Sequence, residues 1–249
     1  SDSVVGVYSF VARPGDETVI EVEATLWPRT DLAQFGVAPL TSMFLFDSSN
    51  RYAFDDFREA VCDANGLQMI SGSGQRLWRP LTNSRELQVS AFLDVNPTGF
   101  GLTQRRREFS SYGDAEARYE RRPSAWIEPV GGWGGGSVVL VEIPMKTEFN
   151  DNIVAFWRPK EPLEKGKPRT WSYRLRWCGQ PPDDAPLARV HATRTGIAPN
   201  NGRRLFVIDF SPSDGEPEGA LEVEASCSAG KLVDSRLEKL PVNGLRRVT

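Results

Sequence analysis

The sequence predicts an all-β protein of the sandwich class. Apolar and polar residues alternate over several short stretches, and turn-forming residues such as those at 13–16 and 63–66 separate these stretches. Only one segment, residues 112–122 ("YGDAEARYERR"), is predicted to form a longer helix. Many short alternating strands joined by turns are typical of two antiparallel sheets that pack face to face.

Four stretches carry this alternation most clearly. The first, "VIEVEATLW", places Ile20, Val22, Ala24 and Leu26 on one face and polar residues on the other. The stretches "ELQVSAFLD", "TWSYRLRW" and "ALEVEAS" repeat the pattern at residues 86–94, 170–177 and 220–226. Each is predicted to be a half-buried strand, because side chains on a strand point alternately to its two faces.

Two loop-like stretches are informative. The glycine-rich "VGGWGGGSVV" at residues 130–139 lacks the GxGxxG spacing of a nucleotide-binding turn and precedes an apolar run, so it predicts a hairpin loop. The stretch "WRPKEPLEKGKPRTW" contains three prolines and several lysines, which predicts a stiff polar connector. We therefore expect one domain over residues 1–159, a linker over 160–169, and a second domain over 170–249.

Composition excludes several functions. With 25% charged residues, 39% hydrophobic residues and a net charge of −3, the chain is typical of a soluble globular protein and gives no reason to expect nucleic acid as a partner. No apolar run approaches the ~20 residues of a membrane helix, so no membrane insertion is expected. The clustered arginines at 105–107 and 121–122 are read as a solvated face or, alternatively, as contacts to sugar hydroxyls.

The rare reactive residues narrow the chemistry further. The chain has a single histidine, His191, which makes a His-based metal site or a Ser-His-Asp triad improbable. We therefore expect no metal and no cofactor. We expect His191 at the surface. Three cysteines are present. Cys178 and Cys227 could form a disulfide in an exported protein, although free thiols are the favoured interpretation.

The stretch "EFNDNIVAFWRP" places Asp151 between two asparagines at the start of an apolar run. The favoured local interpretation is a turn, because Asn and Asp hydrogen-bond their own backbone at loop ends. The alternative is a proton donor held by a rigid strand, whose apolar surroundings would disfavour the ionised form of the carboxyl group.

Several motifs together resemble a known family. They are "FGVAPLTSMFLF" (35–46), "DANGLQM" (63–69), "LWRPLTN" (77–83), "NPTGFGLTQRRREFSSY" (96–112), "ARYERRPSAWIEP" (117–129) and "LVEIPMKTEFNDNIVAFWRP" (140–159). They resemble the periplasmic glucan biosynthesis proteins of Gram-negative bacteria, the OpgG/OpgD (MdoG/MdoD) family. "VEATLWPRTDL" and "FDDFREAVCDANGL" look closer to the D type. The resemblance is specific over residues 1–160 and weaker beyond 170.

The resemblance implies a large β-sandwich domain, of which the C-terminal part is present, followed by an immunoglobulin-like domain. It also implies a periplasmic location and inverting hydrolysis of β-1,2-glucan. Asp151 in the "NDN" motif would be the general acid and Asp63 the general base. One departure is Cys62, which stands where the family usually has His. The roles agree with the local sequence, because Asp63 lies in a polar turn that suits an ionised base.

The resemblance selects Asp151 and Asp63 from 33 acidic residues, among which Asp55, Asp56, Glu128 and Glu142 would otherwise compete.

Sugar rings present apolar faces that stack on aromatic rings, and arginines can donate to sugar hydroxyls. The candidate binding residues are Trp78, Arg79, Tyr119, Arg122, Trp126 and Trp133. For each of them, core packing of the aromatic residues or simple surface charge of the arginines is at least as good an interpretation.

Against the family's domain limits, the chain is expected to be a fragment at both ends. It opens with "SDSVVGVYSF", which has neither an initiating Met nor a visible signal peptide.

The leading hypothesis for the function is a β-1,2-glucan hydrolase, and the main alternative is a non-catalytic glucan-binding or scaffold protein. A structural adhesion module is a weaker third hypothesis, and a homodimer is an open alternative to a monomer.

Overall fold

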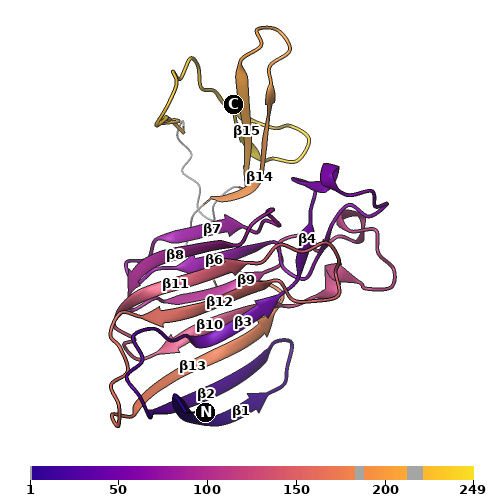
Figure 1. The fold of residues 1–249 in the computed structure, drawn as a ribbon. Helices are drawn as coiled ribbons and strands as arrows, with labels where there is room; N and C mark the ends of the chain where they lie inside the picture. Colours follow the sequence, from indigo (N-terminus) through magenta and orange to yellow (C-terminus); the bar gives the residue numbers. More distant parts are fainter. Residues whose placement is uncertain (1, 183–187, 212–220) are drawn as a thin grey trace. The chain divides into compact units, whose positions relative to one another are not determined.

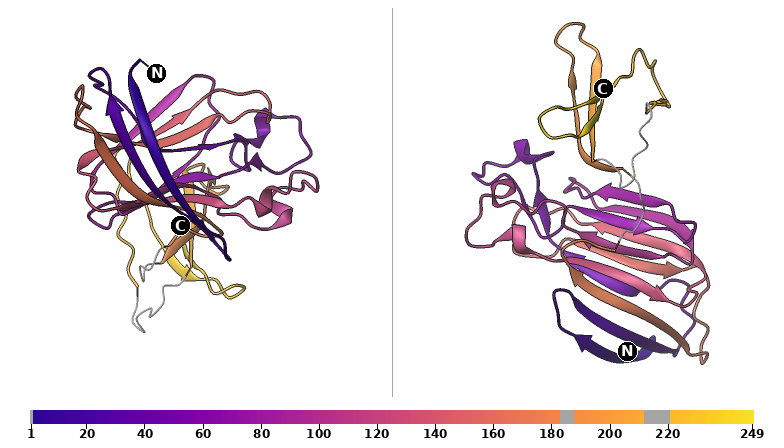
Figure 2. Two further views of the ribbon diagram at one scale, coloured as in Figure 1. Left: turned by 90° about the horizontal axis from the view of Figure 1, so that it is seen from below. Right: turned by 180° about the vertical axis from the view of Figure 1, so that it is seen from behind.

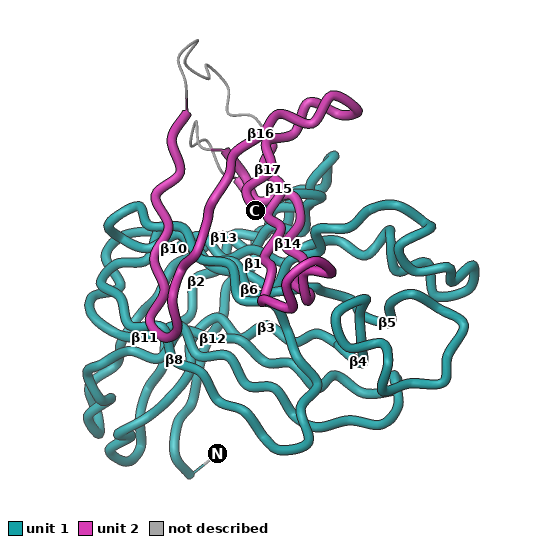
Figure 3. The backbone as a smooth tube through the Cα atoms, turned by 90° about the horizontal axis from the view of Figure 1, so that it is seen from above, with its two compact units in different colours: residues 1–181 teal, residues 182–249 magenta. Residues whose placement is uncertain are grey.

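A computed structural model describes residues 2–182, 188–211 and 221–249. These residues form β-strands, short 3₁₀ turns and loops, which confirms the predicted all-β class. The chain divides into two compact units, residues 1–181 and 182–249, which Figure 3 draws in two colours.

Unit 1 is built on a seven-stranded antiparallel sheet. Its strands, in spatial order, are β1 (Val4–Arg13), β2 (Thr18–Pro28), β13 (Arg169–Cys178), β10 (Ser124–Val130), β9 (Gly99–Thr103), β6 (Gly66–Ile70) and β7 (Arg76–Pro80). The predicted strand around Val22 is β2, and Val22 and Ala24 are both buried on one of its faces, as the alternation predicted.

A four-stranded antiparallel sheet forms the second layer of unit 1. Its order is β3 (Val37–Ser42), β12 (Ile153–Pro159), β11 (Gly135–Glu142) and β8 (Gln88–Val95). A two-stranded ribbon of β4 (Phe44–Phe46) and β5 (Val61–Cys62) continues from β3. Figures 1 and 2 show that the strands of both layers run in similar directions, the arrangement of an aligned sandwich.

The core of unit 1 lies between the two sheets. Val138 and Leu140 of β11 and Trp157 of β12 are fully buried, and they belong to the same apolar cluster as Phe100 and Leu102 of β9. At one end of the strands the loops are longer, and Figures 1 and 2 show β4 and the 3₁₀ turns gathered there. These turns are η1 (Arg51–Ala53), η2 (Phe109–Ser111) and η3 (Tyr119–Arg121).

Unit 2 contains a four-stranded antiparallel sheet in the order β14 (Arg189–Ile197), β15 (Arg204–Ser211), β17 (Arg246–Val248) and β16 (Leu237–Lys239). Asp209 joins three of these elements into one cluster. Its carboxylate accepts two hydrogen bonds from Arg247 and one from Arg194, and these partners lower its pKa to about 2. The four described strands of unit 2 do not identify an immunoglobulin-like topology, which therefore stays a prediction.

The predicted helix at 112–122 is wrong. The segment forms a loop that ends in the single 3₁₀ turn η3. Asp114 Oδ1 accepts hydrogen bonds from the backbone N–H groups of Glu116 and Ala117, which closes a local turn, and Arg118 adopts a left-handed conformation with φ 53°. Both features interrupt a regular helix.

The division between the units differs from the expected linker at 160–169. Residues 169–178 form β13, which lies between β2 and β10 in the large sheet of unit 1. The connector folds back onto the sandwich, because Leu163 and Leu32 exchange two backbone hydrogen bonds. The alternation over residues 170–177 predicts the strand correctly, but the composition of the connector contains no information on which strands pair with β13.

Two further expectations need correction. The glycine-rich segment joins β10 to β11, which belong to opposite sheets, so it is a crossing between layers and not a hairpin loop. Its Trp133 is buried and donates from Nε1 to the carbonyl oxygen of Ser172 at 3.2 Å. Residues 220–226 were expected to be a strand, but Leu221 and the residues after it in this stretch form no strand and are mostly exposed.

The three cysteines are free thiols, so Cys178 and Cys227 do not form a disulfide in this structure. His191 lies on β14 and is exposed, as expected for a surface residue. Among the described residues, no helix is long and apolar enough to span a membrane.

Candidate active site

Strand register brings the two candidate carboxylates to the same short segment. Ile153, the first residue of β12, pairs with Ser42 at the end of β3. The chain then continues into β4, where Phe44 pairs with Cys62 of β5. Asp151 lies two residues before the start of β12 and Asp63 follows β5 directly, so both flank the segment Met43–Phe44.

The side chain of Asn152 fixes this segment. It is 1% exposed, its Oδ1 accepts from the backbone N–H of Phe44 at 2.8 Å, and its Nδ2 donates to the carbonyl oxygens of Phe44 and Ile143 at 2.9 and 3.0 Å. The backbone of Asn152 also bonds to Ser42 and Ile143. Every polar group of this amide is therefore used to hold the backbone next to Asp151.

Asp63 is fixed from the other side. Its backbone N–H donates to the carbonyl oxygen of Met43 at 2.8 Å. Its Oδ1 lies 3.2 Å from Nε of Arg122 in an ion pair, although the two groups are not aligned as a hydrogen bond. The carboxylate is therefore oriented by one arginine that is itself about half exposed.

Electrostatics link the two carboxylates. Burial raises the pKa of Asp63 above its usual value, the positive charge of Arg122 opposes this increase, and the negative charge of Asp151 adds to it. Since the charge of Asp151 acts on the titration of Asp63, the two carboxyl groups are electrostatic neighbours. They come from segments 88 positions apart in the sequence, 151 minus 63.

The environments of the two groups are opposite to the expectation. Asp151 is exposed, because the apolar side chains of β12 turn inward only from Ile153 onward. Asp63, expected in a polar turn that suits an ionised base, is the more buried group and the one with the raised pKa. The apolar run after Asp151 therefore contributes to the core and does not surround its carboxyl group.

Cys62 is buried beneath the site. Its thiol accepts a hydrogen bond from Asn65 Nδ2 at 3.4 Å, and burial raises its pKa well above the usual value, with smaller contributions from Asp47 and Asp63. The thiol is therefore protonated at neutral pH, which makes it a poor nucleophile. At this position it serves as a small packing residue.

Among the binding candidates, Arg122 forms the ion pair with Asp63, and Tyr119 lies beside Arg122. The guanidinium group of Arg122 lies 5.8 Å from the ring centroid of Tyr119. Burial raises the pKa of Tyr119, Glu148 and Asp63 add to this increase, and Arg58 opposes it. Tyr119 itself is 3% exposed, so it lies in the wall of the site and does not offer an open ring face.

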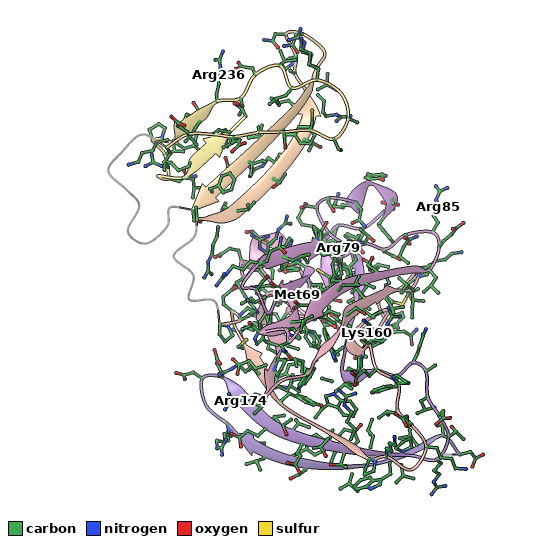
Figure 4. The ribbon with its side chains drawn as sticks, turned by 90° about the vertical axis from the view of Figure 1, so that its left-hand side faces the viewer. Met69, Arg79, Arg85, Lys160, Arg174 and Arg236 are labelled. Carbon is green, nitrogen blue, oxygen red and sulfur yellow. The ribbon has the colours of Figure 1, made fainter. Side chains whose placement is uncertain are left out.

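Trp78 and Arg79 lie on β7, at one edge of the seven-stranded sheet. The Trp78 ring is half-buried, covers Gly66 on the neighbouring strand, and has Arg105 4.5 Å from its centroid. Arg79, labelled in Figure 4, donates to Glu142 of the opposite sheet at 2.8 Å. Glu142 is 1% exposed, so this ion pair links the two layers of the sandwich.

Two other aromatic candidates are core residues. Trp126 is 1% exposed and its ring lies against the backbone of Gly99, where any added Cβ would clash at 2.4 Å. Trp133 is 2% exposed and packs edge-on against Tyr173 at a centroid distance of 6.0 Å. Other protein atoms already cover both rings, so we do not propose that either one stacks on a sugar.

Two of the competing acidic residues, Glu128 and Glu142, are engaged elsewhere, whereas Asp56 pairs with Arg58 and Asp55 is exposed. Glu128 pairs with Arg176 and Arg174 on β13, and Glu142 accepts two hydrogen bonds from Thr82 besides the one from Arg79. Sequence reasoning missed Asn152 as a structural residue and missed Arg58, which binds three carboxylates next to the site. Asn152 could have been found, because it is the second asparagine of the "NDN" motif. Nothing in the sequence distinguishes Arg58 from the other arginines.

The chain matches the family described as "Periplasmic glucan biosynthesis protein, MdoG" over residues 1–249. It is 49% identical to a protein named glucans biosynthesis protein G from Shewanella frigidimarina, over 99% of this chain and 45% of the relative. Proteins of the same name from Vibrio cholerae serotype O1 and Shewanella baltica are 47% and 53% identical, over 100% and 84% of this chain and 46% and 39% of each relative.

The chain thus spans less than half the length of these relatives. Their names refer to the G protein and give no support to the expected closeness to the D type. The periplasm expected from the sequence is the location that the family's description names. The chain belongs to the family of periplasmic glucan biosynthesis proteins.

Proposed function

We propose that the protein acts in the biosynthesis of osmoregulated periplasmic glucans as a glycoside hydrolase that cleaves β-1,2-glucan with inversion. Asp151 is the general acid and Asp63 the general base. The observation that carries the proposal is the convergence of these two carboxylates on the Met43–Phe44 segment, with the charge of one raising the pKa of the other.

The reaction balances with these two groups. Asp151 transfers its proton to the glycosidic oxygen, which leaves as a hydroxyl group of one product. Asp63, as the carboxylate, accepts a proton from water, directly or through an intervening water or sugar hydroxyl, while the water oxygen bonds to the anomeric carbon from the opposite face. Asp63 ends protonated and Asp151 ionised, and proton exchange with solvent restores both.

The roles follow the family resemblance, and the free protein's electrostatics do not assign them. An exposed Asp151 is accessible to a long polymer, and a bound glucan would remove water from around it, which favours the neutral acid. Asp63 keeps an ionised form through its pairing with Arg122. We expect the two carboxyl groups to be ~6.5–9.5 Å apart or somewhat more, as inverting enzymes require.

The first prediction concerns turnover. Asp151→Asn keeps the shape of the side chain and removes its proton, so hydrolysis of linear β-1,2-glucan by the full-length protein should fall ~10²-fold or more. Binding of the glucan should persist, because the substitution keeps the size and polarity of the side chain. Near-normal turnover in this variant would remove Asp151 from the mechanism.

A substrate with an activated leaving group separates the two roles. A glucan carrying a nitrophenyl leaving group needs little protonation, so it should rescue Asp151→Asn but not Asp63→Asn. Rescue of Asp63→Asn alone would reverse the roles. Glucan binding without any turnover in the unmodified protein would favour the alternative, a glucan-binding scaffold.

A further inference from the structure

A cluster of four charged residues lies beside the candidate active site. Arg58 is at its centre, and Asp56, Asp114 and Glu148 surround it. Nε and Nη2 of Arg58 donate to the two oxygens of Asp56 at 3.0 and 2.8 Å, and Nη1 donates to Asp114 at 2.9 Å. The same Nη1 lies 2.8 Å from Glu148 Oε2.

The cluster is partly buried and tightly paired. The side chain of Arg58 is 15% exposed, and those of Asp114 and Asp56 are 9% and 20% exposed. Hydrogen bonding to Asp56 raises the pKa of Arg58, burial opposes this, and Asp114 and Glu148 add to the increase. A guanidinium group has five N–H donors in a planar arrangement, which allows one residue to hold several carboxylates at fixed angles.

The three carboxylates come from three loops that meet at one end of the sandwich. Asp56 lies in the loop between β4 and β5, which Arg51 closes by donating to the carbonyl oxygens of Asp56 and Arg58. Asp114 begins the turn that leads to Tyr119 and Arg122. Glu148 lies in the loop between β11 and β12, three residues before Asp151.

These loops carry the groups that act on the substrate in the proposed function. The loop of Asp114 continues to Arg122, which pairs with Asp63. The loop of Glu148 continues to Asp151. Arg58 is paired with neither Asp63 nor Asp151, but it is hydrogen-bonded to Asp114 in one of these loops and ion-paired with Glu148 in the other.

We propose that Arg58 is a positioning residue that fixes the separation of the two carboxylates by tying the loop of Asp151 to the loop of Arg122. The proposal rests on the proposed hydrolase function for its kinetic consequence. Its structural part, the tie between residues 109–122 and 143–152, stands independently of catalysis. A displacement of about 1 Å between reacting groups can cost ~10²-fold in rate, so a loosened tie should affect turnover more than binding.

The test uses the full-length protein with Arg58→Gln, Arg58→Lys and a matched control, Arg176→Gln. Arg176 also pairs with two carboxylates, those of Glu128 and Glu17, and it lies on β13 outside the site. We expect kcat on β-1,2-glucan to fall ~10-fold or more in Arg58→Gln with KM changed by less than about twofold. Arg58→Lys should recover part of the loss, and Arg176→Gln should leave kcat unchanged.

A second readout does not depend on activity. Backbone amide hydrogen exchange should accelerate in residues 109–122 and 143–152 of Arg58→Gln, and it should not do so in Arg176→Gln. Adding Glu148→Gln to Arg58→Gln should cause little further loss of kcat, because both changes break the same tie.

The outcomes separate the two proposals. If the unmodified protein does not hydrolyse the glucan, the proposed function fails, and hydrogen exchange alone decides the role of Arg58. Unchanged exchange in both segments of Arg58→Gln would overturn the positioning role. So would an equal fall of kcat in Arg176→Gln, which would show a general loss of stability.

Discussion

Asp63 shows how one residue's environment sets its titration. Burial and the charge of Asp151 raise its pKa, and Arg122 alone among the named contributors lowers it. A base must be ionised to act, so activity should fall as the pH drops through the pKa of Asp63. The acidic limb of the pH profile is therefore expected above the usual pKa of an aspartate, and Arg122 limits how far above.

Removing Arg122 gives a prediction with a definite sign. Arg122→Gln removes the positive charge that favours the carboxylate, so the pKa of Asp63 should rise further. The acidic limb of kcat/KM should then move to higher pH, measured on linear β-1,2-glucan across the acidic range. The matched control is Arg121→Gln, because Arg121 is mostly exposed and lies 4.0 Å from Glu120. An unmoved limb in Arg122→Gln would exclude Asp63 as the titrating base.

At the scale of elements, the strands were more predictable than their partners. Alternation located β2 and β13, because a half-buried strand presents apolar residues at every second position. It also located β8, but the prediction of a half-buried apolar face was wrong there, because Val89, Ala91 and Leu93 lie on the exposed face. Sheet order joins segments far apart in sequence, so the place of β13 between β2 and β10 could not be read. The helix expected at 112–122 failed because Asp114 bonds its own backbone and replaces the helical hydrogen bonds.

The candidate site was also only partly predictable from the sequence. The motif around Asp151 can be recognised, but the contact between Asn152 and Phe44 spans 108 positions and depends on the register of β12 with β3. Trp126 and Trp133 have the loop-flanking sequence of sugar-binding aromatics, yet they are buried. Burial depends on which strand faces them, and local sequence does not contain that information.

Asn152 provides the prediction at this scale. Asn152→Ala removes three side-chain hydrogen bonds and leaves the N–H and C=O groups of Phe44 without these partners, which should cost on the order of 3 kcal/mol in the free energy of unfolding. Turnover should also fall, since the segment between the two carboxylates is released. Chemical denaturation measures the first effect. Asn150→Ala is the control, because Asn150 is exposed; an equal loss in both variants would contradict the role of Asn152.

At the scale of the whole molecule, unit 1 has open, apolar edges. Nine of the ten residues of β1 are exposed, and β1 pairs on one side only. On β8, the outward-facing residues Val89 and Leu93 are 59% and 87% exposed. Unpaired strand edges and apolar faces of this kind promote association between chains.

Expression of residues 1–249 alone should therefore give self-associating material instead of a stable, active monomer. Replacing Val89 and Leu93 together with lysine should raise the monomer fraction, measured by light scattering during size-exclusion chromatography. Val242→Lys is the control, because Val242 is 86% exposed and lies in a turn of unit 2, not on a strand. A monomer with cooperative unfolding and full glucanase activity would show that the expected domain limits are wrong.

The anomeric form of the first product tests the central claim most directly. The full-length protein is mixed with linear β-1,2-glucan, and the new reducing ends are followed by proton NMR before they mutarotate. An inverting pair formed by Asp151 and Asp63 predicts α-anomers as the first products, and it predicts no product from Asp151→Asn or Asp63→Asn on the same timescale. First products in the β form, or unchanged hydrolysis in either variant, would contradict the account.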